Sequence, residues 1–486
     1  MFRLNFTFFL IALLFPMSSV RDLANGASGQ RWLSTNSARN FSSDTDLSDR
    51  SWVEAFDALH SKMSREYPFT EWKAIDWASL YSKFRPKIVS AQSRKDDKAY
   101  YLALREYVYS IPDGHVRIRG DDPKKMLADL VGGGYGLAVT RLDDSRIIAH
   151  IILSNGAADK AGIKFGAQII RWDGQPIEKA VEKVPLWYDH KPPTTQESRR
   201  LIQLRYLVRG PVGHKTKVTF RNPGQSKLKT VTLTATDDDL ETLTRTDFYA
   251  TAEERKVPVQ FKILPSGYGY VKITTFPSPQ FASVAAQFKE AIQTFVDKKV
   301  PAMIIDLRHN GGGDDEVTAQ VAGHFFAKKQ FYVSYSIFDP DKKIFEPDPQ
   351  EIVWIEPQAP YYAGKVAAII SNGTVSNGEG LADAIQKLEN GHVIGFYGTN
   401  GAYGGTGGQV NMPNGYIVLY PNARCVDLDG NILLESDKNG VGGVVPDLRI
   451  PRTPETISAS FVEGKDVELD FAVGVLSEQR DPKKMY

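Results

Sequence analysis

Residues Lys365 to Leu388 join an apolar run, a polar turn and a helical pattern, and this combination constrains the fold most strongly. Val366 to Ile370 are all apolar, which is typical of a buried strand. Apolar residues then recur at helical spacing from Leu381 to Leu388. Ser376 and Asn377 fall where the helix should begin. The stretch therefore predicts a strand, a sharp turn and a helix.

The turn itself allows two interpretations of Ser376. At the start of a helix its hydroxyl would lie near free backbone N–H groups and the positive end of the helix dipole, where an anionic intermediate could be held. Serine is also an ordinary helix N-cap residue. The turn alone does not distinguish a nucleophile from a cap, so other parts of the sequence must decide.

A second turn, Asp306 to Gly313, also follows an apolar run and precedes a helical pattern. Its consecutive glycines would leave backbone N–H groups open. If the two turns end neighbouring strands, they could supply an oxyanion hole. Its donors would be the N–H of Gly312 or Gly313 and the N–H of Asn377.

The periodicity changes along the chain and predicts an α/β protein of several domains. Residues 51–122 carry helical patterning and predict an N-terminal helical domain. Residues 123–240 contain short strands and glycines, and strands alternate with helices in an α/β core over residues 255–455. Residues 456–486 are expected to form a C-terminal tail. The glycines from 398 to 408 predict a mobile loop.

The N-terminus predicts export. Arg3 precedes the apolar run Phe8 to Phe15, which is too short to span a membrane and is typical of a secretory signal peptide over residues 1–25. A polar linker, residues 26–50, follows. We therefore expect a secreted or periplasmic protein without a stable membrane span after signal removal. Cys425 is the only cysteine, so an intrachain disulfide is excluded.

The overall charge excludes one class of partner. The formal net charge is +1 and charged residues make up 24% of the chain, so nothing in the composition favours nucleic acid. No zinc-binding or nucleotide-binding motif is present, and we expect neither a metal nor another cofactor.

The order of strands and glycines between residues 126 and 236 resembles a PDZ domain. The resemblance implies that an extended peptide adds to a sheet edge while a glycine-rich loop holds its terminal carboxylate. The peptide-binding residues would be Gly133, Gly134, Tyr135, Gly136 and Leu137. The alternative is a small β domain that serves only as a spacer.

DLRHNGGG at 306–313 and TVSNGE at 374–379, downstream of a PDZ-like domain, resemble the C-terminal processing (tail-specific) serine peptidases and their tricorn-core relatives. The resemblance covers roughly Trp52 to Pro451. It implies a crotonase-like α/β core with Ser376 as the nucleophile. The substrates would be peptides or proteins, bound through their free C-termini.

One position departs from the pattern of the processing peptidases. Gly405 stands where they carry a lysine base. The tricorn-like branch uses a histidine in an Asp-Gly-His turn, which matches Asp113-Gly114-His115. It also uses a glutamate before a Gly-Val-x-Pro-Asp ending. Glu435 fits that role, although the seven residues Ser436 to Gly442 make the spacing longer than usual.

The resulting triad is chemically coherent. A serine hydroxyl needs a base to become a nucleophile near neutral pH, and an imidazole suits that task. A carboxylate at Glu435 would orient the His115 ring. The sequence thus predicts an exported serine peptidase. The alternative is a catalytically inactive binding protein that lost hydrolysis together with the lysine. The natural substrate and the oligomeric state remain open.

Overall fold

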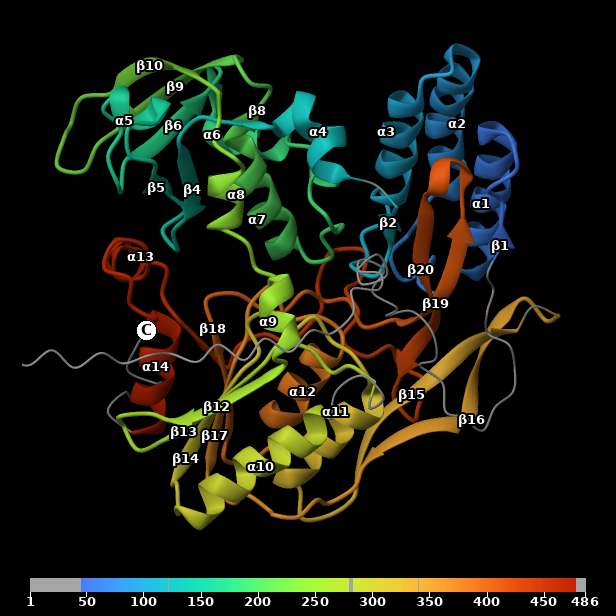
Figure 1. Cartoon of the computed structure of the whole chain (residues 1–486), viewed down its shortest axis with the longest axis vertical. Helices are drawn as coiled ribbons and strands as arrows, with labels where there is room; N and C mark the ends of the chain where they lie inside the picture. The colour runs from blue at the N-terminus through green and yellow to red at the C-terminus, as the bar shows by residue number, and fades with distance from the viewer. Residues whose placement is uncertain (1–44, 121, 279–282, 340, 478–486) are drawn as a thin grey trace, which may run out of the picture.

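The computed structural model describes residues 45–120, 122–278, 283–339 and 341–477. The expected signal peptide and most of the polar linker lie outside the described residues. Figure 1 shows a helical domain, a β-rich domain and an α/β core arranged around a common centre. The predicted multidomain α/β fold is confirmed.

Three helices form the N-terminal domain: α1 (Trp52–Glu66), α2 (Trp77–Arg94) and α3 (Asp97–Val108). The Ser51 side chain accepts the Glu54 N–H and the Glu54 side chain accepts the Ser51 N–H, so a capping box starts α1. The apolar faces of the helices meet in one cluster that includes Phe56, Leu59, Phe84, Leu104 and Tyr107. This cluster continues onto two strands from the far end of the chain, and the domain is therefore not self-contained.

The β-rich domain contains a five-stranded antiparallel sheet in the order β10-β9-β6-β5-β4, with β7 beside β6. Strand β4 lies at its edge, and a small sheet β11-β3-β8 flanks it. The elements are α4 (Pro123–Val131), β3 (Gly133–Gly134), β4 (Leu137–Arg141), β5 (Ile147–Ile152), α5 (Ala157–Lys160), β6 (Gln168–Trp172), β7 (Gln175–Pro176), α6 (Ile177–Glu182), α7 (Gln196–Leu207), β8 (Arg209–Gly210), β9 (Lys215–Arg221), β10 (Lys229–Thr234) and β11 (Thr236–Asp237). Helix α7 packs beside β4.

The core is a six-stranded sheet in the order β12-β13-β14-β17-β18-β21. Strand β12 is antiparallel to β13 and the others run parallel. The strands are β12 (Val259–Ile263), β13 (Gly269–Ile273), β14 (Ala302–Asp306), β17 (Lys365–Ile369), β18 (Gly391–Gly395) and β21 (Leu448–Arg449). Helices α10 (Val284–Asp297), α11 (Asp315–Ala322) and α12 (Asn377–Gln386) cover one face. Both predicted turns follow the carboxyl ends of the neighbouring strands β14 and β17.

A second sheet, in the order β1-β19-β20-β15-β16 with β2 on β20, joins the helical domain to the core. Its strands are β1 (Thr45–Asp46), β2 (Arg117–Arg119), β15 (Gln330–Asp339), β16 (Ile344–Ile355), β19 (Gly405–Asn411) and β20 (Ile417–Val426). The first half of β20 packs on α1 to α3 through Val418 and Tyr420. Its second half joins the core cluster through Ala423 and Cys425.

The glycine-rich segment 398–408 is not the mobile loop that the sequence predicted. Residues 399 to 403 are buried, and Gly405 begins β19. The prediction treated clustered glycines as a sign of flexibility, whereas here they allow close backbone packing: a Cβ on Gly405 would lie 3.0 Å from Ala423 Cβ. Residues 399 to 403 thus belong to the buried interior of the molecule.

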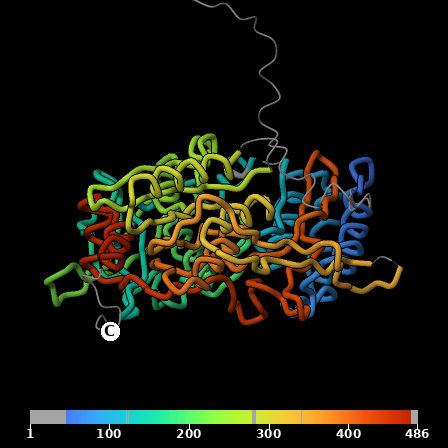
Figure 2. The backbone as a smooth tube through the Cα atoms, turned by 90° about the horizontal axis from the view of Figure 1, so that it is seen from below, coloured from blue at the N-terminus to red at the C-terminus, as the bar shows by residue number. Residues whose placement is uncertain are grey.

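The region expected as a C-terminal tail contains two helices, α13 (Pro454–Phe461) and α14 (Val467–Leu476). Phe471 and Ala472 of α14 pack on Ile304 and Ile369, so α14 covers the second face of the core sheet. Figure 2 places these helices at the opposite end of the molecule from the helical domain. Within the described residues, no helix combines the length and apolar character that a membrane crossing needs.

Replacing Phe471 by alanine should lower the free energy of unfolding by about 3–5 kcal/mol, because its ring fills the interface between α14 and the core sheet. Val462→Ala is the matched control, since Val462 is 62% exposed and should change stability by less than about 0.5 kcal/mol. Denaturant unfolding followed by circular dichroism measures both. Equal stability of the two variants would show that α14 adds little to the core.

Candidate active site

Ser376 occupies the sharp turn between β17 and α12 that the sequence predicted. Its φ of 57° and ψ of −127° are unusual for a residue other than glycine and cost about 1–3 kcal/mol. Its N–H donates to the Ala402 carbonyl at 3.1 Å and to the Glu379 carboxylate at 2.9 Å. Two acceptors therefore hold the backbone of a half-buried serine in a strained conformation.

Glu379 is fully buried and serves as a common acceptor for the segments around Ser376. Besides the Ser376 N–H, it accepts the Thr399 hydroxyl at 2.6 Å, the Gly401 N–H at 2.7 Å and the Ala402 N–H at 3.1 Å. Burial raises the pKa of Glu379 to about 7, while these donors oppose the rise. The carboxylate thus fixes segment 399–403 against the serine turn.

The glycine turn lies directly against the serine turn. Gly312 has a φ of +86°, and a Cβ there would lie 2.6 Å from Ser376 Cβ. Gly313 has a φ of +150°, and a Cβ there would overlap the Phe276 carbonyl. The Asn310 carbonyl accepts the Val375 N–H at 2.9 Å. Both positions require glycine, and the two turns are joined through their backbones.

The three expected oxyanion-hole donors differ in whether their N–H groups already have an acceptor. The Gly312 N–H donates to Asn310 Oδ1 at 2.8 Å and is therefore already used. The N–H groups of Gly313 and Asn377 have no protein acceptor among the residues described. These two groups are the available donors beside Ser376.

A polar network behind these donors was not predicted from the sequence. The buried Asn377 side chain donates to the Gly313 carbonyl at 2.6 Å and to Asp315 Oδ1 at 2.8 Å. It accepts the Tyr332 hydroxyl at 2.5 Å, and the Tyr335 hydroxyl donates to Asp315. Burial raises the pKa of Asp315 to about 6, against the hydrogen bonds from Tyr335 and Asn377.

His115 lies in the turn between α3 and β2. Asp113 Oδ1 accepts the His115 N–H at 2.8 Å and lies 3.7 Å from the ring Nδ1. The Tyr67 hydroxyl donates to the other Asp113 oxygen at 2.8 Å. Burial raises the pKa of Asp113, but the hydrogen bond from His115 and the nearby Lys73 charge outweigh it, so the net pKa is lowered.

Segment 399–403 links the His115 turn to the Ser376 turn. A Cβ on Gly114 would lie 2.7 Å from Asn400 Oδ1 and 3.1 Å from Ala402 Cβ, so the turn packs tightly on this segment. The Asn400 N–H donates to the Thr374 carbonyl at 3.0 Å. The structure thus brings the expected histidine and serine turns onto one short segment.

Glu435 follows β20 and is held by two groups that the sequence did not suggest. Lys73 Nζ lies 2.8 Å from its carboxylate, and both side chains are fully buried. The Tyr403 N–H donates to its other oxygen at 2.6 Å. Burial raises the pKa of Glu435 to about 8, while the Lys73 charge opposes the rise. Only the three-dimensional structure could reveal Lys73, because it lies 362 positions before Glu435 in the chain.

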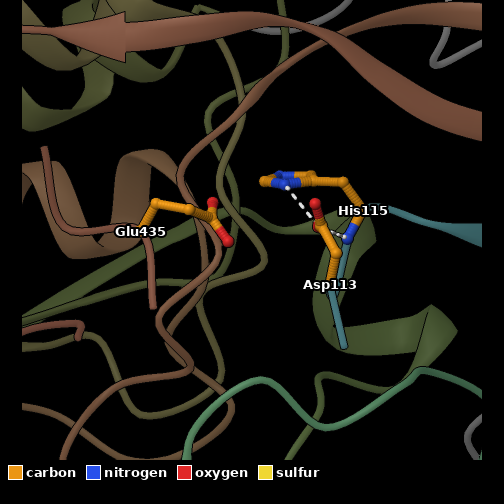
Figure 3. A group of neighbouring side chains, drawn as sticks. All are labelled: Asp113, His115 and Glu435. Carbon is orange, nitrogen blue, oxygen red and sulfur yellow. Dashed lines mark hydrogen bonds and ion pairs between the residues drawn. The ribbon is translucent and has the colours of Figure 1, made fainter. Parts of the chain in front are cut away.

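Figure 3 shows the Glu435 carboxylate facing the Asp113 and His115 pair from a separate segment. One polar atom from each of the three side chains lies within 4.8 Å of the others. Such a group could hold a metal ion, but the Lys73 ammonium already neutralises Glu435, which disfavours another cation. Two carboxylates therefore flank the histidine, where the sequence predicted one.

The surroundings of Gly405 explain why a lysine does not fit there. A Cβ at this position would lie 3.1 Å from the Tyr335 ring and 3.0 Å from Ala423 Cβ. A side chain at position 405 would therefore press on the Tyr335 ring, whose hydroxyl binds Asp315. Glycine fits the close packing between Tyr335 and Ala423.

The five residues expected to bind a peptide are buried. Gly133 and Gly134 form β3 and pair with β8 and β11. A cavity of about 480 Å³ lies between β4, α7 and the core, with Val139, Leu204, Arg308 and His309 in its walls. None of residues 133–137 lines it. Peptide binding by this loop stays a prediction.

Residues 267–450 match the sequence profile of peptidase family S41, and residues 48–97 match the tricorn protease C1 domain. Over residues 267–450 the chain is therefore similar to peptidase family S41. The carboxy-terminal processing protease CtpB of Bacillus subtilis is 23% identical over 64% of this chain and 60% of that protein. A putative tricorn protease homolog of Streptomyces coelicolor is 23% identical over 88% of this chain and 32% of its own length.

A solved structure shares the fold over most of the chain. The crystal structure of mature CPAF superposes with a TM-score of 0.58 at 14% identity, covering 89% of this chain and 98% of CPAF. This likeness concerns the fold alone. The chain spans about 60% of the length of the processing peptidases that it matches.

The raised pKa of Asp315 predicts a pH-dependent contribution to the stability of the α/β core. Between its ordinary value near 3.8 and about 6, the folded chain keeps a proton that the unfolded chain has released. The free energy of unfolding should therefore fall by up to about 3 kcal/mol as pH rises through this range. Asp315→Asn lacks this titration. The melting temperature of the wild type minus that of the variant should thus be larger at pH 4 than at pH 7, and a constant difference would contradict the shift.

Proposed function

We propose that the protein is an exported serine peptidase with Ser376 as nucleophile, His115 as general base and Glu435 as orienting acid. The observation that carries the proposal is segment 399–403. It contacts the His115 turn through Asn400 and Ala402, the Ser376 turn through Ala402, and Glu435 through the Tyr403 N–H. The match of residues 267–450 to peptidase family S41 supports the reaction class.

The proposed reaction proceeds by acyl transfer. Ser376 Oγ attacks the substrate carbonyl carbon while its proton passes to the His115 ring. The carbonyl oxygen becomes an oxyanion, and the N–H groups of Gly313 and Asn377 stabilise it. The C–N bond then breaks, and His115 returns the proton to the leaving amine. Water, activated by the same histidine, hydrolyses the acyl-enzyme.

Peptides and proteins are the proposed substrates, held partly by the β-rich domain. Two relatives are named as carboxy-terminal processing enzymes, which favours a substrate with a free C-terminus. Strand β4 lies at a sheet edge and Val139 of β4 lines the 480 Å³ cavity. An extended peptide added to this edge would therefore reach the side of the core that carries Arg308 and Ser371.

The competing proposal is a binding protein without hydrolysis, and it is favoured by one observation: Gly405 replaces the lysine of the processing peptidases. A fluorophosphonate probe distinguishes the two proposals, because it forms a covalent bond only with an activated serine. Labelling of the wild type at Ser376 supports the peptidase. A chain that neither labels nor cleaves peptides would be a binding protein.

Ser376→Ala and His115→Ala should each lower kcat/KM for a peptide substrate by several orders of magnitude. The double variant should be little worse than either single one, because a triad acts as a unit. Ser93→Ala is the control, since Ser93 is an exposed serine of α2 whose hydroxyl donates to the Ser90 carbonyl of the same helix. Substantial activity in His115→Ala would remove the histidine from the mechanism.

The two carboxylates beside His115 can be ranked by isosteric substitution. Glu435→Gln should lower kcat by about 10- to 1000-fold, less than His115→Ala, because it replaces one of the oxygens with which the carboxyl group would orient the His115 ring. Asp113→Asn keeps the oxygen that accepts the His115 N–H and should cost less than Glu435→Gln. The reverse order in steady-state kinetics would transfer the orienting role to Asp113.

Peptides with a free carboxyl end should bind the full-length Ser376→Ala variant more tightly than their amidated versions. Amidation removes the negative charge of the terminal carboxylate, which would accept hydrogen bonds from backbone N–H groups. Calorimetric titration of matched acid and amide peptides measures the difference. Equal affinities would reduce the β-rich domain to a spacer.

A further inference from the structure

The Asn377 backbone supplies one proposed oxyanion donor, and the Asn377 side chain contacts Gly313, which supplies the other. Its Nδ2 donates to the carbonyl of Gly313 at 2.6 Å, while its own N–H and that of Gly313 lie free beside Ser376. One side chain thus connects the two residues whose N–H groups must point at the same oxygen.

The Asn377 amide is itself fixed from three directions. Asp315 Oδ1 accepts its second N–H at 2.8 Å, and the Tyr332 hydroxyl donates to its oxygen at 2.5 Å. Tyr335 donates to the other oxygen of Asp315. Because all of these groups are at most 8% exposed, water cannot replace a lost partner without entering the core.

We propose that Asp315 and Tyr335 are positioning residues that hold the Asn377 amide and, through it, the Gly313 and Asn377 N–H donors of the oxyanion hole. The proposal rests on the peptidase function proposed above. An oxyanion hole stabilises only the charge that develops during the reaction, and its donors must be oriented beforehand. We call the hydrogen bonds from Tyr335 to Asp315 and from Asn377 to Asp315 the clamp. Loss of the clamp should therefore slow turnover without weakening substrate binding.

The clamp also gives a physical reason for the glycine on α12 that faces it. A Cβ on Gly380 would collide with the hydroxyl groups of Tyr332 and Tyr403. Tyr403 in turn donates its N–H to Glu435. Both tyrosines therefore approach Gly380. Tyr332 lies beside the oxyanion donor Asn377, and Tyr403 lies beside Glu435.

The test compares two variants with one control. Tyr335→Phe removes only the hydroxyl that binds Asp315, and Asp315→Asn keeps the shape of the side chain but removes its charge. Tyr362→Phe is the control, because it removes a buried hydroxyl that donates to the Val300 carbonyl at 3.1 Å. Tyr362 precedes β17, whereas Ser376 follows the other end of that strand. Tyr335→Phe and Tyr362→Phe each delete one buried hydroxyl, so they form the matched pair, and Asp315→Asn removes a buried charge.

Tyr335→Phe and Asp315→Asn should lower kcat by about 10- to 100-fold while KM changes less than about 2-fold, since removal of a whole oxyanion donor costs about 100- to 1000-fold. Affinity for a peptide aldehyde, whose hemiacetal oxygen fills the hole, should fall in parallel with kcat. The same peptide as an amide should bind Ser376→Ala proteins with and without the second change equally. Tyr362→Phe should keep wild-type kcat.

Two outcomes would overturn the proposal. If both variants keep kcat and aldehyde affinity within about 2-fold of the wild type, Asp315 and Tyr335 do not position the donors. If KM and amide-peptide affinity fall as much as kcat, the network is only structural. Failure of the proposed function gives a different result, because the wild type itself would then show neither hydrolysis nor fluorophosphonate labelling.

Discussion

The buried carboxylate of Glu379 is the interaction on which the arrangement of the site depends. Its two oxygens accept four donors, three from segment 399–403 and one from the N–H of Ser376. Without this acceptor, the Thr399 hydroxyl and the N–H groups of Gly401 and Ala402 would lose their buried partner, at about 1–3 kcal/mol each. The same contacts hold Ser376 at a positive φ, so the unusual backbone of the serine and the position of the 399–403 segment have one cause.

The second sheet converts this local arrangement into a link between domains. Strand β20 packs on α1 to α3 with one half and on the core with the other, and β2, which follows the His115 turn, pairs with its first half. The pair Lys73 and Glu435 adds a buried ion pair between the helical domain and the loop after β20. A buried charge that loses its partner is costly. Movement of the helical domain away from the core would leave Lys73 or Glu435 without its partner.

Local patterns were sufficient for the serine and glycine turns, because strand, turn and helix are each determined by nearby residues. The Asp113-Gly114-His115 turn and Glu435 were found only through family resemblance. The partners of Glu379, the capture of the Gly312 N–H by Asn310 and the role of Lys73 could not be predicted, since each depends on which distant backbone groups meet in the core. Clustered glycines predicted flexibility at 398–408, whereas tight packing is the reason for them.

The order of the functional segments along the chain has a consequence for biosynthesis. His115 is made first, Ser376 follows after 260 further residues, and Glu435 comes only near the end. Strand β20, which pairs with the strand β2 that follows the histidine turn, also comes after the serine. A ribosome-bound chain therefore holds the histidine and then the serine without the sheet that brings them together. Under the function proposed above, proteolysis would therefore begin only after β20 and Glu435 have been made, and not while the chain holds the histidine and the serine alone.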